Sequence, residues 1–226
     1  MFFYDPTFLL LIPAIILAIY AQFKVNSTYA ELSKVKSGKG LSGAEVGKKL
    51  LSDNGLSSIA VEEIEGNLTD NYDPRAKTLR LSQGVYRSQS VAAMGIVAHE
   101  VGHAIQDRDA YFPLGIRNNL VPVANLGSTL AFPIFFLGLI FSYPMLMDLG
   151  IIAFSLAVAF QIITLPVEFN ASKRAIKILS DGGFVTQEEA GMAKRVLSAA
   201  ALTYVAATAM IVLNLLRLII LRRSRD

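Results

Sequence analysis

The sequence contains no cysteine and only two histidines among its 226 residues. Without cysteine the chain can form no disulfide framework, no thiolate metal site and no cysteine nucleophile, and its redox compartment stays open. Any zinc ion would have to be held by histidine and carboxylate side chains. Because histidine is so scarce, its placement is informative: both residues lie in one stretch, His99–His103.

The chain also has little net charge, +3, and no visible nucleic-acid-binding motif. Its basic residues gather beside apolar segments, which suits the flanks of membrane spans better than a nucleic-acid surface. Apolar residues, by contrast, are in excess: 53% of the chain is hydrophobic and its mean hydropathy is +0.48. This composition is too apolar for an ordinary soluble protein and predicts a membrane protein in contact with the lipid bilayer.

Four hydrophobic runs are long enough to cross a bilayer: Thr7–Phe23, Leu120–Ser142, Leu149–Val167 and Leu197–Leu216. The first has no basic segment before it and no small-residue cleavage site after it, which favours an uncleaved helix over a signal peptide. We therefore predict a mainly α integral membrane protein with four transmembrane helices. No internal repeat or low-complexity segment is visible.

Charged residues concentrate between the first two runs, where local signals predict a small α+β domain at the membrane surface. Ser42 with Glu45 forms a capping box for a helix that ends at Asn54-Gly55. Ile59–Ile64 is typical of a strand, and Leu68–Tyr72 with Lys77–Ser82 predicts a hairpin. The predicted domains are residues 1–23 (first span), 24–118 (surface domain) and 119–226 (three further spans, with a polar segment at 168–196).

The two histidines form the pattern His99-Glu100-Val101-Gly102-His103 within a helical stretch, Ser90–Gln106. Positions i and i+4 of a helix lie on one face, so both imidazoles can bind one metal ion. Glu100 would then flank the open position of the metal, where a carboxylate can take a proton from an activated water and pass it to a leaving amine. The pattern is that of a zinc hydrolase.

A zinc site of this kind needs a third protein ligand. Asp107 is one candidate, four residues beyond His103 on the same helical face, although it would have to reach a further turn. Glu168 is better placed, because it opens the polar segment after the third hydrophobic run. Spacing alone leaves the choice open, since Glu168 also fits a helix-starting carboxylate after Pro166.

The predicted strand Thr78–Ser82 comes shortly before the histidine helix. In many zinc peptidases an edge strand at this place pairs with extended substrate through main-chain hydrogen bonds. We therefore expect Thr78, Leu79, Arg80 and Leu81 to form a substrate-binding edge; a purely structural strand is the alternative.

The chain resembles the YugP-type neutral zinc metallopeptidases of bacterial membranes over almost its whole length. The resemblance rests on Tyr72–Ser82, Gly84–Tyr86, Ser90–Ala93, Ala98–Gln106 and Leu165–Ala175. It implies a multi-pass endopeptidase of the bacterial inner membrane with a zincin-like domain, a polypeptide substrate, Zn²⁺ on His99, His103 and Glu168, and Glu100 as general base.

A more distant resemblance links the chain to the HtpX and CAAX-prenyl endopeptidases, whose third ligand opens a Glu-x-x-Ala-Asp motif. This chain has Ser172 in place of the Asp. The group that orients a metal ligand therefore has three candidates here: Ser172, Asn170 and Asp107. A donor to the developing oxyanion also has three candidates that the sequence does not rank: Tyr204, Tyr86 and Arg174.

The orientation prediction rests on the basic residues near the span ends. On the side of the histidine motif they are more numerous than on the other, which favours a cytosolic active site. The first group is Lys24, Arg108, Arg117, Lys173, Arg174, Lys177, Lys194 and Arg195; the second is Arg222, Arg223 and Arg225, with Arg217 at the boundary.

Two other function classes stay open at this stage. One is a membrane scaffold or regulator, a partner of another membrane protein or a homo-oligomer, with a structural or vestigial zinc site. The other is a zinc hydrolase that acts on a non-peptide bond. The intact Glu100 argues against the scaffold, because a structural site needs no base. Cleavage within the membrane is disfavoured because polar residues, Gln106–Asp109, follow the motif directly.

Overall fold

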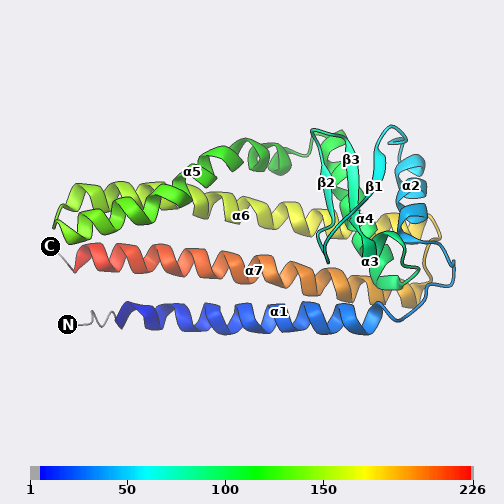
Figure 1. Cartoon of the computed structure of the whole chain (residues 1–226), viewed down its shortest axis with the longest axis horizontal. Coiled ribbons are helices and arrows are strands. Elements are labelled where there is room, and N and C mark those ends of the chain that lie inside the picture. The colour runs from blue at the N-terminus through cyan, green and yellow to red at the C-terminus, as the bar shows by residue number, and fades with distance from the viewer. Residues whose placement is uncertain (1–5, 225–226) are drawn as a thin grey trace. The chain divides into compact units, whose positions relative to one another are not determined.

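The computed structural model of the chain describes residues 6–224 and is mainly helical (Figure 1). Residues 1–5 of the predicted first domain, and Arg225 in the orientation argument, lie outside the described residues. A 3-10 helix, η1 (Pro6–Leu11), precedes seven α-helices: α1 (Ile12–Leu32), α2 (Gly43–Asp53), α3 (Gln83–Tyr86), α4 (Val91–Arg108), α5 (Phe112–Ile140), α6 (Pro144–Asp181) and α7 (Gln187–Arg223). The strands are β1 (Ala60–Ile64), β2 (Asn71–Asp73) and β3 (Thr78–Ser82).

The chain forms two compact units. The first covers the described residues of Met1–Gln22, Gly115–Pro166 and Leu202–Asp226, and the second covers Phe23–Leu114 and Val167–Ala201. The division cuts through α1, α5, α6 and α7, so each of these helices contributes to both units.

The first unit has the character of a membrane domain. Within residues 6–224 four helical segments are long and apolar enough to span a bilayer: Pro6–Leu32, Phe112–Ile140, Pro144–Asp181 and Gln187–Arg223. Only 17–28% of the most hydrophobic window of each is buried inside the protein. Large side chains such as Ile140 and Phe141 are 72% exposed, which requires an apolar surrounding such as lipid. The predicted mainly α membrane protein is confirmed.

The third and fourth spans are parts of longer helices than the hydrophobic runs indicate. Helix α6 has 38 residues and α7 has 37, which at about 1.5 Å per residue exceeds a bilayer core of about 30 Å by several turns. The polar segment 168–196 is therefore the end of α6, a short connection and the start of α7. Pro166 lies inside α6, and Pro122 and Pro133 lie inside α5, as membrane helices tolerate.

The second unit contains the sheet and the shorter helices. The predicted capping box is present, since the Ser42 hydroxyl accepts from Glu45 N–H and the Glu45 side chain accepts from Ser42 N–H. The helix that it opens, α2, is followed by Gly55 at φ +71°, a conformation that glycine adopts without strain. The predicted hairpin is also present, with β2 antiparallel to β3.

The strand order corrects one prediction. The order is β1-β3-β2, with β1 parallel to β3, so Thr78–Ser82 is the central strand and not an edge. The strand is paired with β1 along its whole length and with β2 at Thr78–Arg80, and the side chains of Leu79 and Leu81 are fully buried. Thr78, Leu79 and Arg80 therefore offer no free edge to a peptide, and Leu81 is paired with Glu63 of β1. The strand at the edge on the hairpin side is β2.

The core of the second unit is built around helix α4. Its side chains Val97, Val101 and Ile105 are buried together with residues of α2, β3 and the adjoining parts of α6 and α7. Helix α4 also contacts β2. A helix buried on nearly all sides holds its few polar side chains in fixed positions, because core packing restricts their rotamers.

Candidate metal centre

Helix α4 places the two histidines on one face. The Ser90 hydroxyl caps its first turn by accepting the Ala93 N–H at 3.2 Å. The helix therefore starts where the sequence predicts it. His99 and His103 follow one turn apart, with ring centroids separated by 4.8 Å and planes at 85°. Both rings are partly buried. The predicted alignment of the two imidazoles is present.

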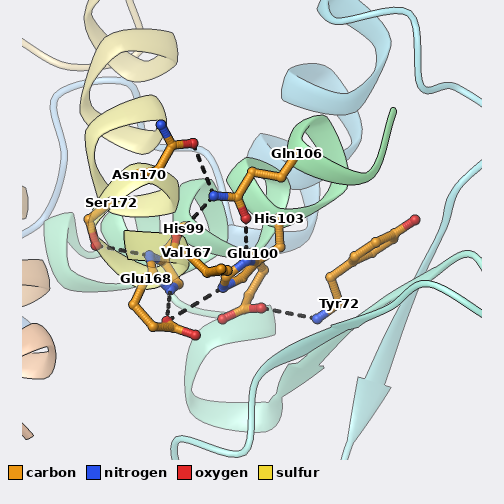
Figure 2. Close-up of polar contacts among 9 residues, drawn as sticks. All are labelled: Tyr72, His99, Glu100, His103, Gln106, Val167, Glu168, Asn170 and Ser172. Carbon is orange, nitrogen blue, oxygen red and sulfur yellow. Dashed lines mark hydrogen bonds and ion pairs between the residues drawn. The ribbon is translucent and has the colours of Figure 1, made fainter. Parts of the chain in front are cut away.

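Glu168 on α6 completes a group that could hold a metal ion. Its Oε2 lies 3.2 Å from Nε2 of His99 and 3.6 Å from Nε2 of His103. The potential ligand atoms of the three side chains all lie within 4.8 Å of one another. Glu168 is only 3% exposed, although it follows the hydrophobic run directly in sequence. Figure 2 shows the two rings and this carboxylate converging on one point.

The distances from the Glu168 oxygen to the two histidine nitrogens fit zinc. Histidine nitrogens and carboxylate oxygens bind Zn²⁺ at about 2.0–2.2 Å in a tetrahedral arrangement, which places two ligand atoms roughly 3.3–3.5 Å apart. The observed separations of 3.2 and 3.6 Å from Glu168 Oε2 bracket that value. Two neutral nitrogens and one carboxylate are also the donor types of catalytic zinc sites, which keep a fourth position open.

Each histidine has a second partner at Nδ1. Nδ1 of His99 lies 3.1 Å from the Ser172 hydroxyl, and Nδ1 of His103 lies 3.0 Å from Oε1 of Gln106. Asn170 does not contact a histidine; its Oδ1 accepts from the Gln106 amide at 3.0 Å. Among the candidates for the group that orients a metal ligand, Ser172 contacts His99 directly. Asn170 is connected to His103 only through Gln106.

Sequence reasoning assigned no role to Gln106. The available signal was its spacing, three residues after His103 on the same helix, which brings the two side chains together. It was overlooked because glutamine is also a common residue of polar helix ends.

Glu100 lies beside the three-residue group. Its Oε2 accepts the main-chain N–H of Tyr72 in β2 at 3.0 Å. In Figure 2 the other carboxylate oxygen points toward Glu168. Burial raises the pKa of Glu100 and outweighs the opposing influence of His99 and His103. A carboxylate with a raised pKa is better matched to accept a proton near neutral pH.

The pKa of His103 is set by opposing influences. Burial lowers it, but the hydrogen bond to Glu168 and the charges of Glu100 and Glu168 raise it above its ordinary value. A bound cation would reverse this balance, because metal and proton compete for the same nitrogen.

Asp107 faces away from the metal group. Its Oδ2 accepts the Tyr72 hydroxyl at 2.8 Å and pairs with Lys77 at 2.6 Å. Burial and the hydrogen bond to Asp107 raise the pKa of the Tyr72 hydroxyl, which keeps it a neutral donor. Asp107 thus connects α4 to the hairpin, and the group that could hold a metal ion is His99, His103 and Glu168.

The oxyanion candidates lie in different places. Arg174 donates to Asn170 at 2.8 Å and pairs with Asp109 at 2.6 Å. Tyr86 ends α3 and packs, partly buried, against the core of the second unit. Tyr204 belongs to the part of α7 that is counted with the first unit. These positions favour none of the three residues over the others, so the oxyanion donor stays a prediction.

Gly102, inside the histidine motif, lies where α4 comes close to the backbone of α6 at Ala171. A Cβ at this position would stand 2.7 Å from the carbonyl oxygen of Ala171, a distance that real Cβ atoms do not show. The missing side chain therefore lets α6 come near enough for Glu168 to reach both histidines. In the motif this position formally accepts any residue, but here the packing requires glycine.

Comparisons with known proteins agree with this site. A family model described as "Putative neutral zinc metallopeptidase" matches residues 7–223. The "Putative membrane protease YugP" of Bacillus subtilis (strain 168) is 45% identical over 212 residues, which cover 94% of each chain. No solved structure matches. With a match over nearly its whole length, the chain belongs to this family of neutral zinc metallopeptidases.

Proposed function

We propose that the protein is a membrane-bound zinc endopeptidase in which His99, His103 and Glu168 hold the metal and Glu100 is the general base. The observation that carries the proposal is the convergence of the three ligand atoms within 4.8 Å, with the Glu100 carboxylate beside them. A structural zinc site would need no partly buried carboxylate next to its ligands.

In the proposed reaction, zinc and the side chain of Glu100 have different roles. Bound zinc would lower the pKa of a water molecule and polarise the carbonyl of the scissile peptide bond. Glu100 is placed to accept a proton from the attacking water and to donate it to the leaving amine. The Tyr72 N–H holds one oxygen of Glu100 in place, so the carboxylate keeps the other oxygen toward the reacting atoms.

The substrate in this proposal is an extended polypeptide near the membrane. In the sequence the site lies next to a candidate membrane span, because Glu168 directly follows the hydrophobic run Leu149–Val167 of α6. Strand β2, the edge strand whose Tyr72 contacts Glu100, takes over the substrate-pairing role first expected of β3. Main-chain pairing of this kind holds many sequences across a site.

The activity is tested on detergent-purified protein. Zinc content by mass spectrometry should be about one ion per chain, and casein or an unstructured peptide should be cut in a chelator-sensitive manner. Zinc-loaded protein that cuts no peptide but hydrolyses another bond would refute the endopeptidase assignment. Absence of zinc after reconstitution would refute the metal site itself.

The site faces the cytosol of a bacterial inner membrane in this proposal, because basic residues are more numerous near the span ends on its side. A single cysteine tests this without interference, since the chain has none of its own. Lys39→Cys is suitable because Lys39 is exposed, whereas the neighbouring Ser37 is buried. A membrane-impermeant maleimide should label this cysteine only after the cells are opened. Labelling of intact cells would show that the site faces the outside instead.

A further inference from the structure

Gln106 is a fully buried polar residue with a complete set of partners. Its exposed fraction is 0%. Its Nε2 donates to the main-chain oxygen of Val167 at 2.9 Å and to Oδ1 of Asn170 at 3.0 Å, and its Oε1 faces Nδ1 of His103 at 3.0 Å. A buried amide is costly unless its groups are paired, so this arrangement constrains the side chain strongly.

Two groups determine the direction of the hydrogen bonds around Gln106, because one of them can only accept and the other can only donate. The Val167 carbonyl can only accept, so the NH₂ group of Gln106 must face it. The Arg174 guanidinium can only donate, so Asn170 must present Oδ1 to it at 2.8 Å, and the same oxygen accepts from Gln106. Oε1 of Gln106 is therefore the atom that faces His103.

An oxygen at Nδ1 of His103 determines where that imidazole carries its proton. Oε1 can only accept, so Nδ1 must be the protonated nitrogen. Nε2 then keeps its lone pair, and it is Nε2 that lies near Oε2 of Glu168, at 3.6 Å. Neutral imidazole with a free Nε2 is the form that binds a metal ion.

The other histidine has no such constraint. Its Nδ1 contacts the hydroxyl of Ser172 at 3.1 Å, and a hydroxyl can either donate or accept. The two metal-binding histidines thus differ in how firmly their tautomer is set.

The same amide also joins the two helices of the site. Val167, which accepts from Gln106, immediately precedes Glu168 on α6, while Gln106 and His103 lie one turn apart on α4. A single side chain therefore holds a histidine from one helix and the backbone next to the carboxylate of the other.

We propose that Gln106 is a positioning residue of the metal centre: it holds His103 with Nδ1 protonated and anchors α6 next to Glu168. The inference rests on the proposed zinc site. It assigns to a glutamine the role that a carboxylate or main-chain carbonyl fills behind many metal-binding histidines.

Histidine-selective ¹⁵N labelling gives a direct test, because the chain has only two histidines and both are at the site. The protein is purified without a polyhistidine tag and loaded with zinc. In the unmodified protein both rings should show metal-bound Nε2, and His103 should show a slowly exchanging Nδ1–H. In Gln106→Met this proton should become fast-exchanging, while the His99 signals stay in place.

The matched variant is Ser172→Ala, which should change the signals of His99 and leave those of His103. Zinc affinity, measured by competition with a chromophoric chelator, should fall about 10- to 100-fold in Gln106→Met. Should Gln106→Met fail to fold, Gln106→Glu replaces it: this variant keeps an oxygen at His103 and should retain the protected Nδ1–H.

A folded Gln106→Met with unchanged zinc affinity and unchanged His103 signals would overturn the proposal while leaving the enzymatic function intact. Loss of the protected proton in a folded Gln106→Glu would overturn it as well. If the unmodified protein bound no zinc, the proposed function would fail first, and this inference with it.

Discussion

Helix α4 and the Val167–Arg174 segment of α6 contribute to the same site in different ways. Helix α4 supplies His99, Glu100 and His103 from five consecutive positions, fixed by the pitch of one buried helix. The α6 segment supplies Glu168, 69 positions after His99, together with Ser172 and Asn170, which support the histidines. The first contribution is local in sequence, whereas the second exists only because two helices pack closely.

The two contributions should therefore respond differently to substitution. The spacing on α4 survives any change that leaves the helix intact, so substitution of Glu100 there should affect a single function. The α6 segment acts through distances between helices, so substitutions there should affect metal binding as a whole.

The largest effect is expected from Glu168→Ala. It removes the only α6 side chain of the metal-binding group, and two histidines alone hold zinc too weakly to survive purification. Zinc content and activity should both be lost, and Glu168→Asp should lose part of each because its carboxylate is about one methylene shorter. Metal analysis and peptide digestion on the same samples measure this.

Glu188→Gln is the control, because Glu188 is exposed in the first turn of α7 and should leave zinc unchanged. Glu189 is not a suitable control, since it accepts the N–H groups of Gly38 and Thr186 at 2.7 Å. Retention of stoichiometric zinc in Glu168→Ala, with loss of zinc in Asp107→Ala, would place the third ligand on α4 instead.

Glu100→Gln should separate activity from metal binding. The change removes the base but leaves both histidines and Glu168 in place, so turnover should fall by about 10²- to 10⁴-fold or more while zinc content stays near one per chain. Steady-state hydrolysis of a fluorogenic peptide measures the first, and metal analysis the second. Turnover near that of the unmodified protein would remove Glu100 from the mechanism.

Gly102 tests the contact of α4 with α6, and Gly95, which faces Ala193 of α7, is its control. Gly102→Ala places a methyl group 2.7 Å from the Ala171 oxygen and should cost about 1–3 kcal/mol of stability and weaken zinc binding. Gly95→Ala meets only Ala193, at 3.4 Å, and should be neutral or stabilising by up to about 1 kcal/mol. Thermal unfolding in detergent compares them; equal behaviour would mean that the approach at Gly102 is not limiting.

The smallest effect is expected from Asp107→Asn. It weakens the ion pair with Lys77, whose side chain is 58% exposed, so the loss of stability should be at most about 1 kcal/mol. Zinc content should be unchanged, because Asp107 contacts the hairpin and not the metal group. A clear loss of zinc in a folded Asp107→Asn would show that the contribution of α4 extends beyond His103.

The features that could be predicted from the sequence are those with a local physical cause. The Ser42 capping box, the helix stop at Gly55, the hairpin and the alignment of His99 with His103 each depend on residues within a few positions. Hydrophobic runs likewise predicted the four spans, because length and apolarity alone decide whether a helix suits a bilayer.

The features that could not be predicted depend on contacts between distant segments. Thr78–Ser82 was expected at the sheet edge because alternation and turns do not reveal that β1 pairs with its other side. Gln106 was overlooked because its importance comes from Val167 and Asn170, more than 60 positions away. The ends of α6 and α7 extend past the hydrophobic runs because a helix continues wherever packing supports it, not only where lipid requires it.

The close contact of Gly102 with Ala171 would be the pivot if α6 tilted. Glu168 is three residues from Ala171, roughly 4.5 Å along the axis, whereas the start of the helix at Pro144 is roughly 40 Å away. A tilt of about 5° around this contact, of the kind that a change in bilayer thickness induces, would move the far end by roughly 3.5 Å but Glu168 by only about 0.4 Å. Because Glu168 is close to this contact, a tilt of α6 around it would leave the geometry of the group that could hold a metal ion nearly unchanged.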